Sequence, residues 1–164
     1  MRAVAATFLT ATLTLGTSVG VAGQGSDTDP GVPVGPDASY FTGTMECEWE
    51  HTGTEHVDGV EQYAEHFDCA WEATDPRVAG TEELAIVTYG SHGAAFPWSA
   101  VGTLTNDEGS WRGSGQGLAD RTMFNHGEMA YVGEGAYEGL TMHYYVAGPN
   151  SEMTLAGWIA PAAD

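Results

Sequence analysis

Three histidines stand in the most acidic part of the chain, where metal binding is the first chemistry to consider. His51, His56 and His66 are interspersed with glutamate and aspartate between residues 46 and 68. Imidazole nitrogens and carboxylate oxygens are ligands of zinc and copper. However, the histidines lack a compact His-x-x-x-His spacing, and a chain with 23 acidic residues places carboxylates beside any histidine. A His/carboxylate metal-binding hairpin is therefore an alternative hypothesis, and we assign no metal ligand and no cofactor.

A second group of residues could support acid–base chemistry. Glu134 and Tyr137 are close in sequence, and Arg112 and His126 lie on segments expected to be nearby strands. A buried carboxyl group with a raised pKa can act as a general acid or base. Glu134, however, stands between two glycines at an expected turn, which favours exposure. The sequence also has no Gly-x-Ser-x-Gly elbow and no glycine-rich nucleotide loop, so we name no catalytic residue.

Two cysteines stand almost symmetrically about the turn signal Asp58-Gly59. Folding the chain back at this turn pairs Cys47 with Cys69 and places Trp49 and Trp71 on the same face, which is the geometry of a β-hairpin. In an oxidising compartment such a pair forms a disulfide, which would stabilise the fold by about 3 kcal/mol. A redox or metal-binding pair is the alternative, although neither cysteine belongs to a Cys-x-x-Cys motif.

The elements that position these residues are expected to be strands. Apolar and polar residues alternate from Tyr40 onward, and no stretch shows an apolar stripe of helical period. Glycine, proline, asparagine and aspartate divide this region into short segments, which predicts an all-β domain. The predicted strands are 41–51, 62–72, 83–89, 96–105, 110–118, 123–132, 137–147 and 152–159.

Two architectures fit about eight short, sequential, antiparallel strands: a β-barrel and a two-sheet β-sandwich. Gly113, Gly115 and Gly117 alternate along one strand, so that one face of it lacks side chains. Such a row lets a sheet bend sharply or leaves space beneath it, as barrels require. The glycines therefore favour an eight-stranded antiparallel β-barrel, with the sandwich as the alternative.

Aromatic residues on the later strands could line a cavity in such a barrel. Rings with a few polar tips suit an apolar ligand, and Trp111 shares the parity of the glycine row. If a cavity exists, we expect Trp98, Trp111, Tyr131 and Tyr145 to be its ligand-binding residues. The same rings would also serve as the ordinary core of a small barrel, and this second interpretation stays open.

The first residues indicate export. Residues 1–23 combine an arginine, an uncharged run of apolar and small residues and a small-residue cleavage site, as secretory signal peptides do. Residues 24–39 are rich in proline, glycine and aspartate and are expected to form a disordered acidic linker. The β-barrel domain is then 40–164. We expect a secreted protein or one at the exterior of the cell envelope, with no membrane contact after cleavage.

Charge excludes one class of partner. The chain has 23 acidic residues, four arginines and no lysine, which gives a net charge of −19. Such a surface repels phosphate backbones, so nucleic-acid binding is not expected. An acidic, lysine-free composition is also typical of proteins that stay soluble in salt.

Three segments carry a family resemblance: Asp75-Pro76-Arg77-Val78-Ala79-Gly80-Thr81, Gly109-Ser110-Trp111-Arg112-Gly113 and Gly133-Glu134-Gly135-Ala136-Tyr137-Glu138-Gly139-Leu140. Together they resemble bacterial proteins of the allene oxide cyclase barrel-like group, over roughly residues 44 to 159. The resemblance implies an eight-stranded antiparallel barrel, often with an apolar cavity, in a superfamily that includes plant dirigent proteins. Some members cyclise or isomerise reactive apolar substrates. The plant enzyme's catalytic residues have no match here, so the resemblance implies no catalytic role.

These observations rank three hypotheses. The leading one is a non-enzymatic module that binds a small apolar molecule or has a structural role outside the cell. The alternative is a cyclase- or isomerase-like enzyme that steers an apolar substrate by shape. The metal-binding hairpin comes third.

Overall fold

A computed structural model describes residues 37–90 and 95–163. The predicted signal peptide, and residues 24–36 of the predicted linker, lie outside the described residues. The described chain is almost entirely strand. The strands are β1 (Ser39–Val57), β2 (Val60–Ala73), β3 (Gly80–Tyr89), β4 (Ala95–Thr105), β5 (Gly109–Asp120), β6 (Phe124–Gly135), β7 (Leu140–Pro149) and β8 (Glu152–Pro161).

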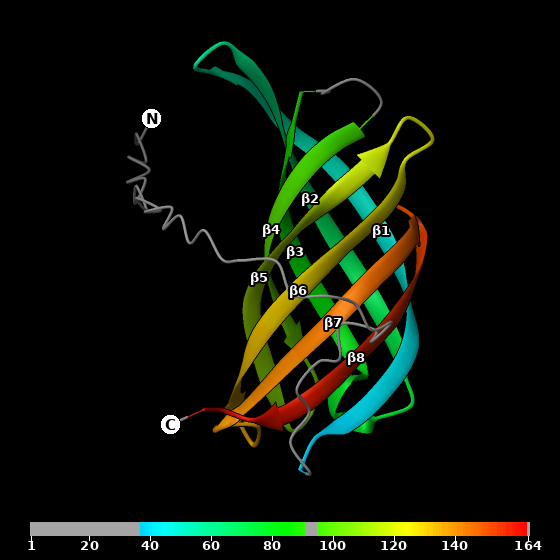
Figure 1. Ribbon diagram of the computed structural model, residues 1–164, viewed down its shortest axis with the longest axis vertical. Helices are drawn as coiled ribbons and strands as arrows, with labels where there is room; N and C mark the ends of the chain where they lie inside the picture. Colours follow the sequence, from blue (N-terminus) through cyan, green and yellow to red (C-terminus); the bar gives the residue numbers. More distant parts are fainter. Residues whose placement is uncertain (1–36, 91–94, 164) are drawn as a thin grey trace, which may run out of the picture. The chain divides into compact units, whose positions relative to one another are not determined.

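The eight strands form one closed antiparallel barrel (Figure 1). Each strand pairs with the next along the chain, and β8 returns to pair with β1 from Ser39↔Ile159 to Glu46↔Glu152. This closure confirms the predicted barrel and excludes the sandwich. Along β4 and β8, for example, buried side chains alternate with more exposed ones, so one set of alternate residues fills the interior. The part of β1 from Glu48 onward has no buried side chain. Among the described residues, no helix is long and apolar enough to cross a membrane.

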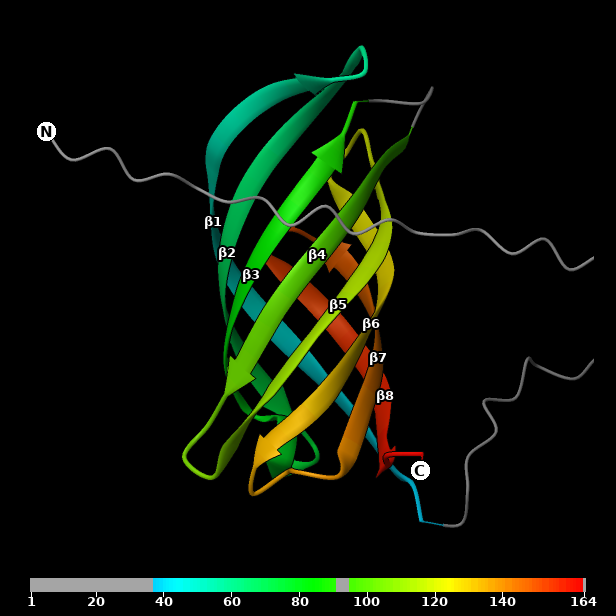
Figure 2. The same cartoon turned by 90° about the vertical axis from the view of Figure 1, so that its left-hand side faces the viewer.

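The β1–β2 hairpin has the predicted register, with Cys47 opposite Cys69 and Trp49 opposite Phe67. The two cysteines form the predicted disulfide. Asp58 and Gly59 both have positive φ angles, 53° and 80°, which is the conformation of a tight hairpin turn. β1 pairs with β8 only as far as residue 46, whereas β2 stays paired with β3 as far as Gln62↔Tyr89. Only the tip of the hairpin therefore projects beyond the other strands (Figure 2).

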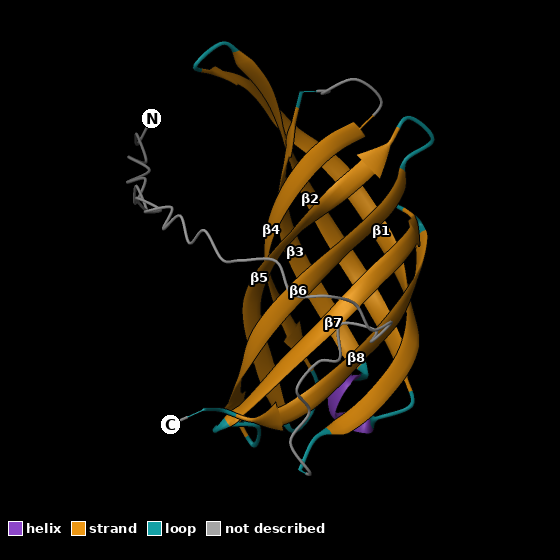
Figure 3. Cartoon of the chain, viewed as in Figure 1, coloured by secondary structure: helices purple, strands orange, loops and turns teal. Residues whose placement is uncertain are grey.

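One end of the barrel is closed by the connection between β2 and β3. It contains a short 3₁₀ helix, η1 (Pro76–Val78), drawn in purple in Figure 3. The Asp75 side chain accepts a hydrogen bond from the backbone N–H of Arg77 and forms an ion pair with its guanidinium at 2.6 Å. Val78 is fully buried, and the Trp111 indole donates to the Arg77 carbonyl at 2.8 Å. This segment therefore plugs the barrel and is held in place by Asp75 of its own motif and by Trp111 of β5.

Strand boundaries differ from the prediction where turn chemistry decides them. The segment predicted to begin at residue 137 begins at Leu140, because residues 136–139 turn the chain and Gly139 has φ 83°. The turn between β4 and β5 is an Asx turn, in which the Asn106 side-chain oxygen accepts from the N–H groups of Glu108 and Gly109.

Candidate functional site

The end of the barrel opposite η1 contains a pocket of about 220 Å³, which we call the mouth pocket. It lies between the ends of β2, β3, β4, β5 and β6 and the turn between β7 and β8. Its volume is somewhat below the roughly 300–1,000 Å³ of typical ligand sites, so it suits a compact molecule. Its walls are formed by Phe67, Ile86, Phe96, Trp98, Ala119 and Met123, with the polar residues Tyr63, Glu65, Thr88, Asn125 and Asn150.

Polar groups of the mouth pocket are held by hydrogen bonds within its wall. Thr88 donates from its hydroxyl to the Glu65 carboxylate at 2.8 Å. Asn125 donates from its side-chain amide to the side-chain oxygen of Asn150, which is buried, and to the Met123 carbonyl at 3.3 Å. The mouth pocket is thus an apolar cup with a few fixed polar groups, which is the usual composition of a small-molecule site.

Below the mouth pocket the barrel is almost filled. A cavity of only about 30 Å³, the inner cavity, lies beneath it and shares Phe67, Ile86, Trp98 and Asn125 with its lining. The glycine row does not leave an empty space. Side chains of neighbouring strands occupy this face: Tyr131 lies against Gly113, Met129 against Gly115 and Trp98 against Gly117. A Cβ atom added at any of these three glycines would overlap the side chain that lies against it.

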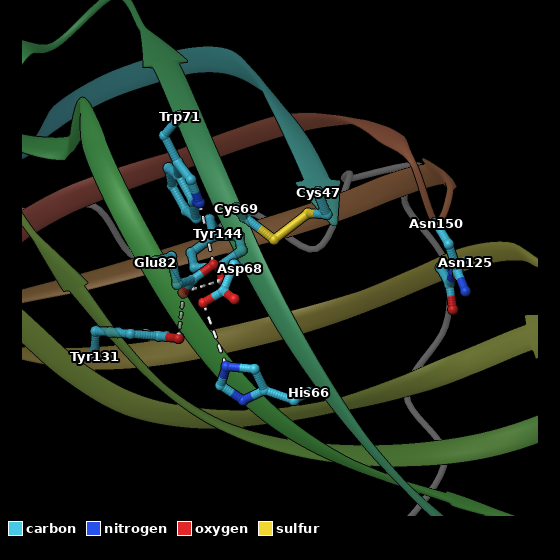
Figure 4. The surroundings of a disulfide bond; sticks show 10 residues. All are labelled: Cys47, His66, Asp68, Cys69, Trp71, Glu82, Asn125, Tyr131, Tyr144 and Asn150. Atoms are coloured by element: carbon cyan, nitrogen blue, oxygen red, sulfur yellow. Dashed lines mark hydrogen bonds and ion pairs between the residues drawn. A yellow bond between two sulfur atoms is a disulfide. The ribbon is translucent and has the colours of Figure 1, made fainter. Parts of the chain in front are cut away.

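A buried carboxyl group lies deeper in the barrel. Glu82 is 1% exposed, and three donors from other strands converge on it (Figure 4). The Tyr131 and Tyr144 hydroxyls donate to Oε1 at 2.6 and 3.2 Å, and the Trp71 indole donates to Oε2 at 3.1 Å. Burial raises the pKa of Glu82 to about 7, and the three hydrogen bonds offset part of that effect.

The Glu82 cluster is a structural network. Both carboxyl oxygens already accept hydrogen bonds, and Glu82 is not among the residues that line the mouth pocket or the inner cavity. Burial also raises the pKa values of Tyr131 and Tyr144, so both phenols stay protonated and remain donors. The cluster ties β2, β3, β6 and β7 together across the interior.

The four residues predicted to bind a ligand lie in different places. Trp98 lines the mouth pocket and the inner cavity. Trp111 is fully buried near the plugged end and stacks on Tyr137, with ring centroids 4.8 Å apart. Tyr131 belongs to the Glu82 cluster, and Tyr145 lies on the outer face, 51% exposed. The structure therefore brings only Trp98 to the mouth, and ligand binding by these residues stays a prediction.

The other candidate groups are dispersed. Within the described ranges, no three His, Cys, Asp or Glu side chains are placed to hold a metal ion. His51 contacts Thr54, His56 lies 3.9 Å from Glu61, and His66 lies 3.3 Å from Asp68.

The residues considered as an acid–base candidate are dispersed as well. Arg112 and Glu134 are exposed and 3.8 Å apart, whereas the Tyr137 hydroxyl donates to Asn106 at 2.8 Å, near the plugged end.

Sequence reasoning did not single out Glu82, Asn125 or Asn150. For Glu82 a signal was present, because it shares a face with Leu84 and Ile86 in an alternating pattern. The predicted strand began one residue later and left it out. Asn125 and Asn150 are 25 residues apart and meet only because β6 pairs with β7 at the mouth. Nothing local in the sequence marks that contact.

Comparisons with known proteins support the fold only. No protein-family model matches the chain, and no curated protein matches it. A solved structure of a DUF3224-family protein of unknown function from Shewanella oneidensis MR-1 is similar to 77% of this chain and all of its own, with a TM-score of 0.62 and 12% identity. At this identity the likeness shows a shared β-barrel-like fold. It gives no specific sign of the allene oxide cyclase barrel-like group.

Proposed function

We propose that this protein is a small-molecule binder that holds a compact, mainly apolar ligand in the mouth pocket. The observation that carries the proposal is the asymmetry of the barrel: one end is plugged by η1, and the other has an apolar cup of about 220 Å³. Burial of apolar surface would supply most of the affinity. The sequence resemblance to barrels with apolar cavities supports the same proposal.

Binding is favoured over catalysis by the position of the ionisable groups. The carboxyl group with the most perturbed pKa, Glu82, is enclosed by three donors and separated from the mouth pocket. At the mouth itself, the Glu65 carboxylate already accepts the Thr88 hydroxyl. A general acid or base must reach its substrate directly or through one water. We therefore place the ligand-binding hypothesis ahead of the cyclase-like one.

We also infer that the protein works in an oxidising compartment. The disulfide between Cys47 and Cys69 supports this location, because such bonds persist outside the reducing cytosol. The export signal predicted for residues 1–23 points the same way.

A titration with ethylbenzene followed by NMR tests the binding proposal. We expect saturable shifts of the Ile86 and Met123 methyl resonances at the mouth, and unchanged methyl resonances for Val132, which is exposed on the outer face. Thr88→Phe would fill the mouth pocket and abolish the shifts. Thr81→Phe makes the same change on the outer face of the same strand and should leave them intact. Absence of saturable binding to the unmodified protein would instead favour a structural barrel.

A further inference from the structure

Trp98 has a buried indole N–H group that lacks a hydrogen-bond partner within the described part of the chain. The side chain is 7% exposed, so bulk water does not readily replace the missing acceptor. The other two buried tryptophans differ: Trp71 donates to Glu82 and Trp111 donates to the Arg77 carbonyl. Buried indole N–H groups usually find a partner, so the exception at Trp98 needs an explanation.

The indole is fixed where it is. Gly117 and Gly127 face each other on β5 and β6, and the Trp98 ring lies over both. A Cβ atom added at either glycine would overlap the ring atom Cζ2 of Trp98, so only glycines leave room for the ring. Two adjacent strands thus both have glycine at the position where this one ring packs. The ring cannot turn toward another partner without losing this fit.

Within the described part of the chain, no acceptor is placed to receive a hydrogen bond from the Trp98 N–H. Trp98 lies between the mouth pocket and the inner cavity and lines both, and their walls are mainly apolar. Asn125, the polar residue shared by both linings, donates its side-chain NH2 group to Asn150 and Met123, and its side-chain oxygen forms no hydrogen bond with the Trp98 N–H. A single water in the inner cavity is the rival explanation, but a buried water normally needs two to four polar partners.

We propose that Trp98 selects the ligand, and that the ligand is a compact neutral molecule with an apolar body and one acceptor oxygen, such as a ketone or an ester. This inference rests on the proposed function, because it assigns the chemistry of the same mouth pocket. The ligand's oxygen must displace part of the pocket wall to reach the buried Trp98 N–H, and the apolar body would then contact Phe67, Ile86 and Phe96. Anionic ligands such as carboxylates are disfavoured by Glu65 in the wall and by the net charge of −19.

Three probes of similar size separate these contributions: acetophenone, ethylbenzene and benzoate. Acetophenone has an acceptor oxygen, ethylbenzene is more apolar and has none, and benzoate is an anion. Affinities are measured by NMR titration of the purified protein, and the Trp98 indole N–H resonance is identified by through-bond assignment of the unmodified protein. We expect acetophenone to bind about tenfold more tightly than ethylbenzene, as one additional hydrogen bond to a buried donor allows. Benzoate should bind most weakly.

The variants locate the preference. Trp98→Phe should lower acetophenone affinity to that of ethylbenzene and change ethylbenzene affinity by no more than about twofold. Trp158→Phe is the matched control, because this ring lies on the outer face against His143, and it should keep the preference for acetophenone. In the unmodified protein, acetophenone should move the Trp98 indole proton downfield. This measurement uses the wild-type protein alone, so it does not depend on whether a variant folds.

The outcomes are distinguishable. If ethylbenzene binds as tightly as acetophenone and the indole proton does not move, the mouth pocket binds ligands but Trp98 does not select them, and the inference is overturned. If no probe binds, the proposed function fails together with this inference. A preference for acetophenone that survives in Trp98→Phe would assign the acceptor contact to another residue and overturn the inference.

Discussion

Replacing Glu82 by glutamine should remove a pH dependence from the stability of the barrel. The carboxyl group has an ordinary pKa of 4.5 and a pKa of about 7 in the folded protein. Between these values the folded state binds more protons than the unfolded state, so the free energy of unfolding falls as pH rises. The stability contributed by neutral Glu82 is fully present below about pH 4.5 and is lost by about pH 7. The loss amounts to about 3 kcal/mol.

Urea unfolding followed by far-ultraviolet circular dichroism, at several pH values between about 4.5 and 8, measures this loss. The relevant quantity is the difference in unfolding free energy between the wild-type protein and Glu82→Gln, because the other carboxylates and the self-repulsion of the acidic surface affect both proteins equally. Glutamine stays neutral and keeps an acceptor oxygen, so its pH profile should be flatter by about 3 kcal/mol. Glu83→Gln removes the neighbouring exposed charge and should retain the wild-type profile.

Parallel profiles for wild type and Glu82→Gln would refute the reasoning, because they would mean that folding leaves the pKa of Glu82 unchanged. If the variant does not fold, the ¹³C resonance of the wild-type carboxyl group can be titrated directly. A midpoint near pH 4.5 would then have the same meaning as parallel profiles. A midpoint near pH 7 would confirm that burial outweighs the three hydrogen bonds.

Further predictions concern the hairpin, the barrel wall and the plug. Replacing Cys47 and Cys69 together by serine should lower the free energy of unfolding by about 3 kcal/mol in urea titrations, because the disulfide closes a loop with a sequence separation of 22; an unchanged value would contradict this. Gly117→Ala should cost roughly 1–3 kcal/mol and shift near-ultraviolet circular dichroism, because its Cβ would overlap an indole ring. Asp75→Ala should cost about 1 kcal/mol through loss of the η1 cap. The ion pair with Arg77 adds to this cost and holds the pKa of Asp75 below its usual value, so the ion-pair part is fully present above about pH 4 and is lost as pH falls through the lowered pKa. A cost that stays constant over this range would exclude the ion pair as a contributor.

The hairpin could be predicted pair by pair because its signals are local. Side chains in a strand alternate with period 2, so the positions of Cys47, Cys69 and the turn at 58–59 leave one register that joins the sulfurs. The same alternation was enough to predict eight strands, and the glycine row favoured a barrel over the alternative sandwich. These inferences need only neighbouring residues and the geometry of one or two strands.

The contents of the interior could not be predicted in the same way. Whether glycines leave a cavity depends on the side chains of the facing strands, and here Tyr131, Met129 and Trp98 lie over them. Tyr144 and Tyr145 are adjacent aromatics of which one faces inward, and the choice is set by pairing with β6 and β8. Local sequence carries no information about either point.

The pairing of β1 with β8 also has a consequence for how the chain acquires its structure. The first strand of the barrel finds its second partner only when the last strand exists, more than 100 residues later. Until then, a growing chain has two unpaired strand edges, on β1 and on β7, which are available to other chains. Closing so long a loop makes folding slow, because the chain loses conformational entropy before the contacts between β1 and β8 can stabilise it. A chain truncated before β8 would keep both edges unpaired and would remain an open sheet prone to aggregation.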